Sequence, residues 1–204
     1  VVLGVRLSCT SDFSIGGDTT ETQIRLSLTI DGSGVSEVST GIPFLDHMLT
    51  LFSRHSLMDL NVAATGDVEV DYHHTVEDVG IVLGQALSKA LGDKKGIERY
   101  GACYLPMDET LARVVVDLSG RSFLEFRADD RSGMIRDFPF QLVEEFFRGL
   151  TNHLQANVHA EILYGRDAHH MAEALFKGLA KALDVACRRD PRRAGQLPTT
   201  KEAW

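Results

Sequence analysis

Two short stretches of this sequence carry the same set of residues that could bind metal ions. Residues 71–78 read DYHHTVED and residues 167–174 read DAHHMAEA. In each stretch, a glutamate follows three positions after the second of two adjacent histidines, and the second set lies 96 positions after the first. The six residues are His73, His74, Glu77, His169, His170 and Glu173. This recurrence predicts an internal duplication in which both copies ligate metal.

The spacing of each HHxxE set suits the start of a helix. The glutamate is three residues after one histidine and four after the other, so it shares a helix face with both. The two adjacent histidines point about 100° apart, because a helix has 3.6 residues per turn. One ion could not easily bind both histidines of a set. Two ions could bind all of them if each ion were bound by one histidine from each repeat.

The ligand types narrow the choice of metal. Imidazole and carboxylate without thiolate suit Mn²⁺, Fe²⁺, Zn²⁺ or Ni²⁺, and many ligands per ion favour six-coordinate Mn²⁺ over tetrahedral Zn²⁺. The HExxH proteases are excluded, since that motif does not occur. Further candidate ligands are His47 in FLDHML and, 98 positions later, Glu145 in LVEEFF, because both interrupt apolar stretches. The remaining histidines have weaker claims as metal ligands: His55, His153 and His159.

The elements that must position these residues also occur twice. Residues 21–34 alternate apolar and polar side chains, which is typical of a half-buried strand, and residues 109–120 repeat the pattern from the same Glu-Thr start. A helix with a proline near its start, an apolar strand and a histidine-led helix follow in each half. The expected ranges are 42–55, 58–64 and 74–91 in the first half, and 138–153, 155–163 and 170–183 in the second.

The sequence therefore predicts an α+β fold made by tandem duplication of a strand–strand–helix–strand–helix half-domain. The first half covers residues 1–92, and the second, with a C-terminal tail, covers residues 93–204. The glycine-bounded turn GDKKG at 92–96 is the expected hinge. Neither half need bury all its apolar surface alone, so the halves should pair about a pseudo-twofold axis. The helix at 140–153 is apolar on two faces, which indicates that it is covered on both.

Composition limits the class of protein. The chain has 204 residues, 44% of them apolar, and a formal charge of −8, which disfavours nucleic acid and anionic membranes as partners. The basic run RRDPRR at 188–193 is accordingly interpreted as the close of a helix. No apolar run is long enough to span a membrane. The three cysteines are far apart and without a CxxC motif, which fits a reducing compartment and predicts a cytoplasmic protein.

Six segments together resemble the imidazoleglycerol-phosphate dehydratase family of histidine-biosynthesis enzymes. They are GIPFLDHML (41–49), GDVEVDYHHTVEDVGIVLGQAL (66–87), YLPMDETLARVVVDLSGR (104–121), LVEEFF (142–147), YGRDAHHMAEALFK (164–177) and the tail from DPRR to LPTTK (190–201). The resemblance covers essentially the whole chain from about residue 18. The doubled HHxxE is its most specific feature.

The resemblance implies two sheets sandwiching four helices and two Mn²⁺ ions per active site. It also implies an assembly of 24 subunits with sites built between neighbouring copies. The family's metal-ligand positions fall on His47, His73, His74, Glu77, Glu145, His169, His170 and Glu173.

The implied reaction is dehydration of imidazole glycerol phosphate to imidazole acetol phosphate, through a metal-bound imidazolate and a diazafulvene-like intermediate. Proton transfer needs a carboxylate within reach, and Glu21, Glu77 and Glu173 are the candidates. The residues expected to bind substrate or phosphate are Glu21, His55, Arg99, Arg121, Lys177, Thr199, Thr200 and Lys201. Glu202, beside the last of these, departs from the family's usual tail and adds a negative charge.

Two other functions compete with the lyase. A metal-binding scaffold that has lost its chemistry would keep the HHxxE sets, but it would not need the phosphate-binding cations. A hydrolase that uses metal-bound hydroxide would not need an imidazole-shaped site, so inhibition by azoles would distinguish it from the lyase.

Overall fold

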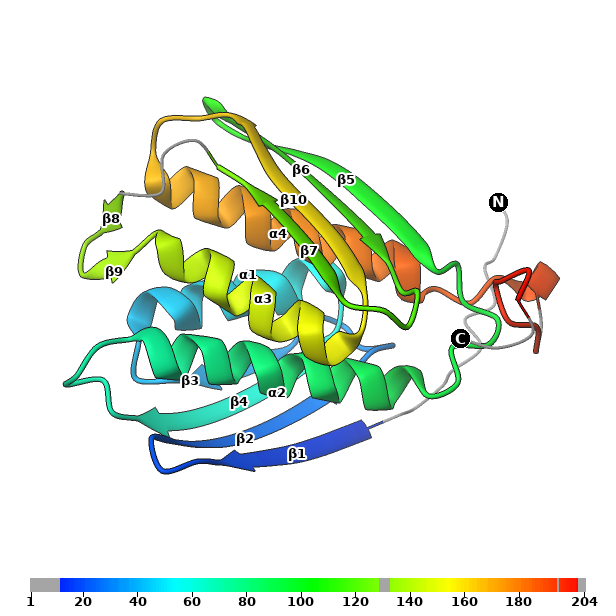
Figure 1. Cartoon of the computed structure of the whole chain (residues 1–204), viewed down its shortest axis with the longest axis horizontal. Helices are drawn as coiled ribbons and strands as arrows, with labels where there is room; N and C mark the ends of the chain where they lie inside the picture. The colour runs from blue at the N-terminus through cyan, green and yellow to red at the C-terminus, as the bar shows by residue number, and fades with distance from the viewer. Residues whose placement is uncertain (1–11, 129–132, 194, 202–204) are drawn as a thin grey trace.

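Two four-stranded sheets enclose four helices in this chain (Figure 1). The structure is a computed structural model, and it describes residues 12–128, 133–193 and 195–201. Glu202 and Cys9 lie outside the described residues. The first half comprises β1 (Asp12–Asp18), β2 (Thr22–Thr29), β3 (Ser36–Ser39), α1 (Pro43–Ser56), β4 (Asp59–Gly66) and α2 (His73–Leu91). The second comprises β5 (Tyr100–Met107), β6 (Thr110–Asp117), β7 (Phe123–Arg127), β8 (Met134–Ile135), β9 (Phe138–Pro139), α3 (Gln141–Leu154), β10 (Asn157–Tyr164), α4 (Ala168–Cys187) and a 3₁₀ turn at Pro191–Arg193.

The two large sheets have the same topology. Their strand orders are β1-β2-β4-β3 and β5-β6-β10-β7. In each, three neighbouring strands are antiparallel, while the edge strand β3 or β7 lies parallel to β4 or β10. Strand β2 buries alternate side chains as its sequence pattern predicts, and β6 does the same. These repeated orders confirm the tandem duplication, whereas the boundary between residues 92 and 93 stays a prediction.

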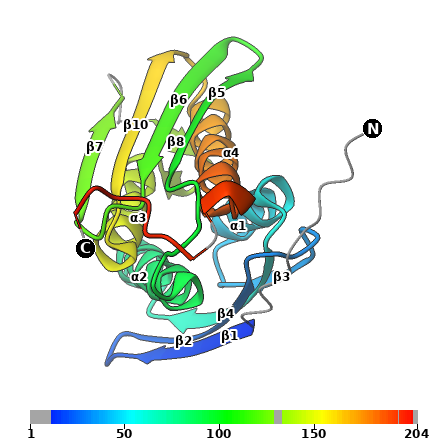
Figure 2. The same cartoon turned by 90° about the vertical axis from the view of Figure 1, so that its right-hand side faces the viewer.

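The four helices lie between the two sheets. Helices α1 and α2 lie on the first sheet, and α3 and α4 lie on the second (Figures 1 and 2). Across the middle, α1 packs against α4 and α2 packs against α3, so each helix pair joins one helix from each half. The predicted sandwich of two sheets around four helices is confirmed.

The structure adds detail that the sequence pattern did not reveal. Each half contains a further strand, β3 or β7, before its first helix. These strands have only four and five residues, too few to give a strong alternating signal. Pro43 occupies the first turn of α1 as expected. Pro139 does not begin α3, because it pairs with Met134 in the small β8–β9 hairpin and the helix starts at Gln141.

The apolar core runs continuously through both halves. The apolar residues of α3 that were expected on two faces are all buried, which confirms that the helix is covered on both sides. Phe146 and Phe147 meet Phe176 of α4 with ring centroids 4.9 and 5.7 Å apart. Among the described helices, none combines the length and apolarity needed to cross a membrane.

Helices α2 and α3 approach each other through glycine. A Cβ atom added to Gly80 would lie 2.5 Å from the carbonyl oxygen of Phe146, and one on Gly84 would lie 2.5 Å from that of Leu150. From the other side, a Cβ on Gly149 would lie 2.8 Å from the carbonyl oxygen of Glu77. This close contact fixes the first HHxxE set against α3, the helix that carries Glu145.

We expect Gly80→Ala to destabilise the folded chain, although alanine inside a helix is more favourable than glycine by about 1 kcal/mol. The added methyl group would overlap a backbone carbonyl that cannot rotate away, and overpacking of this kind costs about 1–3 kcal/mol. Denaturant unfolding of the variant measures the net change in stability. Lys89→Ala, on the exposed part of the same helix, is the control. Unfolding of Gly80→Ala at or above the wild-type midpoint would contradict the close contact.

Candidate active site

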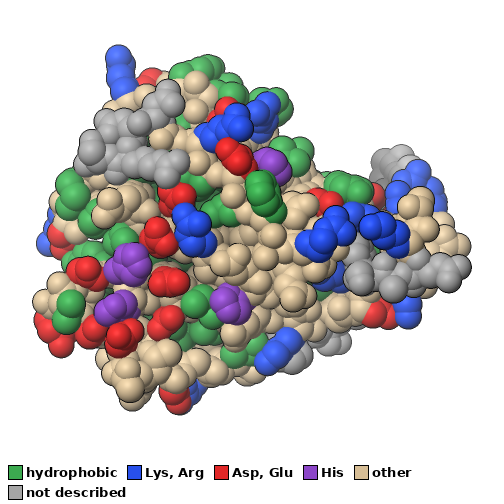
Figure 3. Space-filling model, viewed as in Figure 1, with side chains coloured by type: hydrophobic (Ala, Val, Ile, Leu, Met, Phe, Trp, Pro, Cys, Tyr) green, Lys and Arg blue, Asp and Glu red, His purple; other side chains and the backbone are tan. Residues whose placement is uncertain are grey.

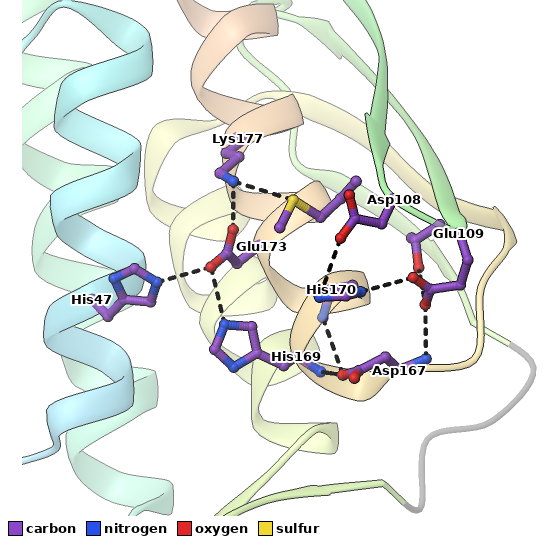
Figure 4. Close-up of polar contacts among 10 residues, drawn as sticks. His47, Asp108, Glu109, Asp167, His169, His170, Glu173 and Lys177 are labelled. Atoms are coloured by element: carbon purple, nitrogen blue, oxygen red, sulfur yellow. Dashed lines mark hydrogen bonds and ion pairs between the residues drawn. The ribbon is translucent and has the colours of Figure 1, made fainter.

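Three of the predicted metal ligands converge on one point between α1 and α4. Oε1 of Glu173 lies 2.9 Å from Nε2 of His47 and 3.0 Å from Nε2 of His169 (Figure 4). These three side chains each offer a ligand atom, and the atoms lie within 4.8 Å of one another. His47 comes from the first half, whereas His169 and Glu173 come from the second. We call these three residues the Glu173 cluster.

Glu173 is held in its charged form. Its side chain is only 8% exposed, and burial by itself would raise its pKa. Hydrogen bonds from Lys177, His47 and His169 outweigh burial and lower the pKa to about 2. Because a carboxylate can only accept hydrogen bonds, both imidazoles donate to it through Nε2–H. A metal ion in the cluster would replace these two protons, as is usual when histidine becomes a ligand.

Lys177 lies on the same face of α4 as Glu173, as the spacing of four residues predicts. Its ammonium group donates to Oε2 of Glu173 and lies 3.5 Å from Sδ of Met107. On α1, His55 has its pKa lowered by burial and by the nearby charges of Lys177 and Lys181. Lys177 and Lys181 therefore both lie near His55, and their charges would favour an anionic ligand at that point.

The equivalent set in the other helix pair is more open. On α2, Nε2 of His73 lies 3.7 Å from Oε2 of Glu77. On α3, Glu145 occupies the position equivalent to His47, and its carboxylate lies 3.5 Å from Nε of Arg148. Among the described residues, three possible metal ligands converge this closely only in the Glu173 cluster, so metal binding by His73, Glu77 and Glu145 stays a prediction.

The second histidine of each set points away from the first. The ring planes of His73 and His74 are 82° apart, and those of His169 and His170 are 89° apart. Nδ1 of His74 contacts Asp67 at 3.0 Å, and Nδ1 of His170 contacts Glu109 at 2.8 Å. These contacts raise the pKa of both histidines. The expected divergence is confirmed, and His170 lies outside the Glu173 cluster (Figure 4).

The remaining candidate acid, Glu21, lies in the β1–β2 turn beside the first set. Its carboxylate is 3.7 Å from Nδ1 of His74, which is too long for a hydrogen bond, and its side chain is 49% exposed. This position leaves the carboxylate accessible to a ligand near His74.

Arg99 is one of the predicted phosphate-binding residues, and in this chain it already has partners. Its guanidinium donates to both carboxylate oxygens of Asp117, at 2.7 and 3.1 Å, and to the carbonyl oxygen of Pro198 at 2.8 Å. The bonds to Asp117 raise the pKa of Arg99, and the bond to Pro198 attaches the tail to the second sheet. Arg121 is exposed in the β6–β7 turn. The tail residues Thr200 and Lys201 are also exposed, and Thr199 is half-buried.

The predicted metal ligands and the predicted phosphate-binding tail lie at opposite ends of the folded molecule. Helices α2 and α4 begin with their HHxxE sets at the left of Figure 1, whereas the tail is at the right. Arg99 donates its backbone N–H to Ala186, near the end of α4. His170 and Ala186 are separated by roughly 24 Å along that helix. Histidine and acidic side chains gather at the left of Figure 3, while lysines and arginines predominate at the right.

Two residues at the site were not predicted from the sequence. Glu109 and Asp67 are the partners of His170 and His74. Glu109 could have been found from the repeat, because the Glu-Thr pair at 109–110 matches the pair at 21–22. Arg166 stands at the position that matches Asp67 in the second half, and only the structure reveals the contact of Asp67 with His74.

Comparison with known proteins agrees with this geometry. Residues 40–183 match the family model described as imidazoleglycerol-phosphate dehydratase. An imidazoleglycerol-phosphate dehydratase from Akkermansia muciniphila is 59% identical over 186 residues, covering 90% of this chain and 94% of that protein. One from Geobacter metallireducens is 55% identical over 181 residues, covering 89% and 93% of the two proteins.

Solved structures of the same enzyme share the fold. The crystal structure from Staphylococcus aureus has a TM-score of 0.80 and 42% identity, covering 88% of this chain and 99% of that one. The crystal structure from Pyrococcus furiosus, in complex with (S)-C348, has a TM-score of 0.80 and 34% identity, covering 93% and 100%. On the strength of the family model and these relatives, this chain belongs to the imidazoleglycerol-phosphate dehydratase family.

Proposed function

We propose that this chain is a Mn²⁺-dependent hydro-lyase that converts imidazole glycerol phosphate to imidazole acetol phosphate in histidine biosynthesis. Membership of the family supports the reaction. The observation that carries the metal dependence is the convergence of His47, His169 and Glu173 from different halves on one point. The cytoplasmic location stays a prediction.

The donor atoms of the Glu173 cluster suit the proposed ion. Two imidazole nitrogens and one ionised carboxylate, without thiolate, are acceptable ligands for Mn²⁺. A second ion would be held by His73, Glu77 and Glu145, and His74 and His170 would complete the two ligand sets. When bound, the ions supply Lewis acidity that makes the proton on the carbon next to the substrate's imidazole ring easier to remove.

The protein's own groups would bind the substrate and move its protons. Glu21, accessible beside His74, is placed to accept a hydrogen bond from the substrate or to remove a proton from it. Glu77 and Glu173 are the alternative shuttles, although Glu173 already accepts from three side chains. Lys177 and His55 would contact the substrate beside the Glu173 cluster, where the ammonium group would attract the anionic phosphate.

A complete site would need more than one copy of the chain. The tail residues Thr199, Thr200 and Lys201, together with Arg99 and Arg121, are proposed to bind the phosphate group. The distance along α4 of roughly 24 Å is too long for a small substrate to bridge within one chain. A neighbouring copy would therefore bring its tail to the histidines, consistent with the proposed assembly of 24 subunits.

We expect removal of metal with a chelator to abolish dehydration of imidazole glycerol phosphate, and added Mn²⁺ to restore it. His170→Ala, assayed beside the wild type, should stay inactive after Mn²⁺ is returned, because the complete ligand set needs this imidazole. Formation of imidazole acetol phosphate is the readout. Binding of two ions per chain without any turnover would contradict the lyase and support a metal-binding scaffold, whereas phosphate release without dehydration would support a hydrolase.

A further inference from the structure

Glu109 is built into the second half as a fixed partner of His170. Its Oε2 lies 2.8 Å from Nδ1 of His170, while Oε1 accepts from the backbone N–H of Asp167 at 3.1 Å and from the hydroxyl of Thr110 at 3.1 Å (Figure 4). The side chain is 24% exposed, and the bond with His170 is the main cause that lowers its pKa to about 2. Both carboxylate oxygens therefore have defined partners.

Nε2 of His170 remains available. An ionised carboxylate can only accept, so Nδ1 of His170 carries the proton that Glu109 binds. In the neutral ring, the lone pair is then on Nε2. The nearest acid to Nε2 is Asp108, at 3.9 Å, which is beyond hydrogen-bond distance, and its side chain is 77% exposed.

The first half reaches the same arrangement with a different residue. Glu21 is the counterpart of Glu109 in the duplication, but it lies 3.7 Å from Nδ1 of His74. Asp67 has taken its place, with its carboxylate oxygens 3.0 and 3.2 Å from that nitrogen. Two histidines that are equivalent by duplication are thus held through the same ring atom by carboxylates that are not equivalent.

The loop that leads into the histidine-led helix differs between the halves in length and in its first residue. Gly66 and Gly165 are matching positions, since each lies against the threonine that begins the paired strand, Thr22 or Thr110. The loop from Gly66 to His73 holds residues 67–72, whereas the loop from Gly165 to His169 holds only residues 166–168. The residue after Gly66 is Asp67, whereas the residue after Gly165 is Arg166, which offers no acceptor to an imidazole N–H.

We propose that Asp67 and Glu109 are positioning residues that fix the tautomers of His74 and His170, so that each histidine presents Nε2 as a metal ligand. Because Asp67 orients His74, Glu21 is left free to contact the substrate. The inference rests on the proposed metal centre. A carboxylate behind a histidine ligand orients the ring and raises its basicity, and its loss typically lowers metal affinity about 10- to 100-fold.

The test compares four single variants by calorimetric titration of the metal-free protein with Mn²⁺. We expect Glu109→Gln to weaken Mn²⁺ binding at the site that includes His170, and Asp67→Asn to weaken it at the site that includes His74, each about 10- to 100-fold. Glu21→Gln, at the position equivalent to Glu109, should keep wild-type Mn²⁺ affinity and lose turnover. Glu161→Gln, which removes a carboxylate paired with Arg113 on the same sheet, should bind as the wild type does.

Unchanged Mn²⁺ affinity in both Glu109→Gln and Asp67→Asn would overturn the inference but leave the proposed function intact. Failure of the wild type to bind Mn²⁺ would overturn both. Thermal unfolding without metal shows whether a variant has lost its fold instead of its ligand geometry. For a variant with a lowered unfolding temperature, pulsed electron paramagnetic resonance at saturating Mn²⁺ counts the coordinated imidazoles in ¹⁵N-histidine protein. Fewer coordinated imidazoles than in the wild type support the inference, and an equal number contradicts it.

Discussion

Glu173→Gln is expected to lower kcat by roughly 10²–10⁴-fold, the range for loss of an essential acid–base group, and to remove bound Mn²⁺ as well. The carboxylate receives hydrogen bonds from His47, His169 and Lys177 and is nearly buried. Glutamine keeps the shape but loses the charge, so the ligand set is weakened and the ammonium of Lys177 is left without its counter-charge. Steady-state kinetics and elemental analysis of the purified variant measure the two effects.

The matched control for this variant is Asp184→Asn. It also removes a carboxylate of α4, one that is paired with Arg188 at 2.6 Å, and it should leave turnover and metal content unchanged. Circular dichroism checks that both variants fold. A folded Glu173→Gln chain with wild-type turnover and Mn²⁺ content would show that the Glu173 cluster is not the metal centre.

A mixed assembly of two variant chains, each inactive by itself, is expected to regain part of the wild-type activity. Glu173→Gln damages the histidine end of the chain, and Lys201→Glu places a negative charge in the tail proposed to bind phosphate. If each site joins the histidine end of one copy to the tail of another, random assembly of equal amounts leaves about a quarter of the sites intact. Co-expression of the two chains with different tags, followed by purification on both tags, yields the mixed assembly for assay.

A second pair provides the control for this experiment. Glu173→Gln mixed with His169→Ala should stay inactive, because both changes fall in the same cluster and every cluster then carries one of them. Activity of the first mixture that does not exceed that of the separate variants would contradict sites shared between copies.

The sequence predicted the duplication, the helix-borne HHxxE sets and the divergence of neighbouring histidines, because these follow from periodicity within single elements. It could not predict that His47 would join His169 and Glu173. That grouping depends on α1 packing against α4, a contact between halves that no local pattern encodes. The contact of Asp67 with His74 could not be predicted for a similar reason, since it depends on how the loop after β4 is placed beside the start of α2. The proposed roles of Arg99 and the tail would also depend on contacts with a neighbouring copy of the chain.

The most direct test of the metal centre is anomalous X-ray diffraction at the manganese edge from crystals of the Mn²⁺-loaded protein. We predict an anomalous peak within bonding distance of Nε2 of His47, Nε2 of His169 and the carboxylate of Glu173, with a further imidazole from a neighbouring copy completing the set. Well-ordered crystals of active, Mn²⁺-loaded protein with no peak between these three side chains would contradict the account.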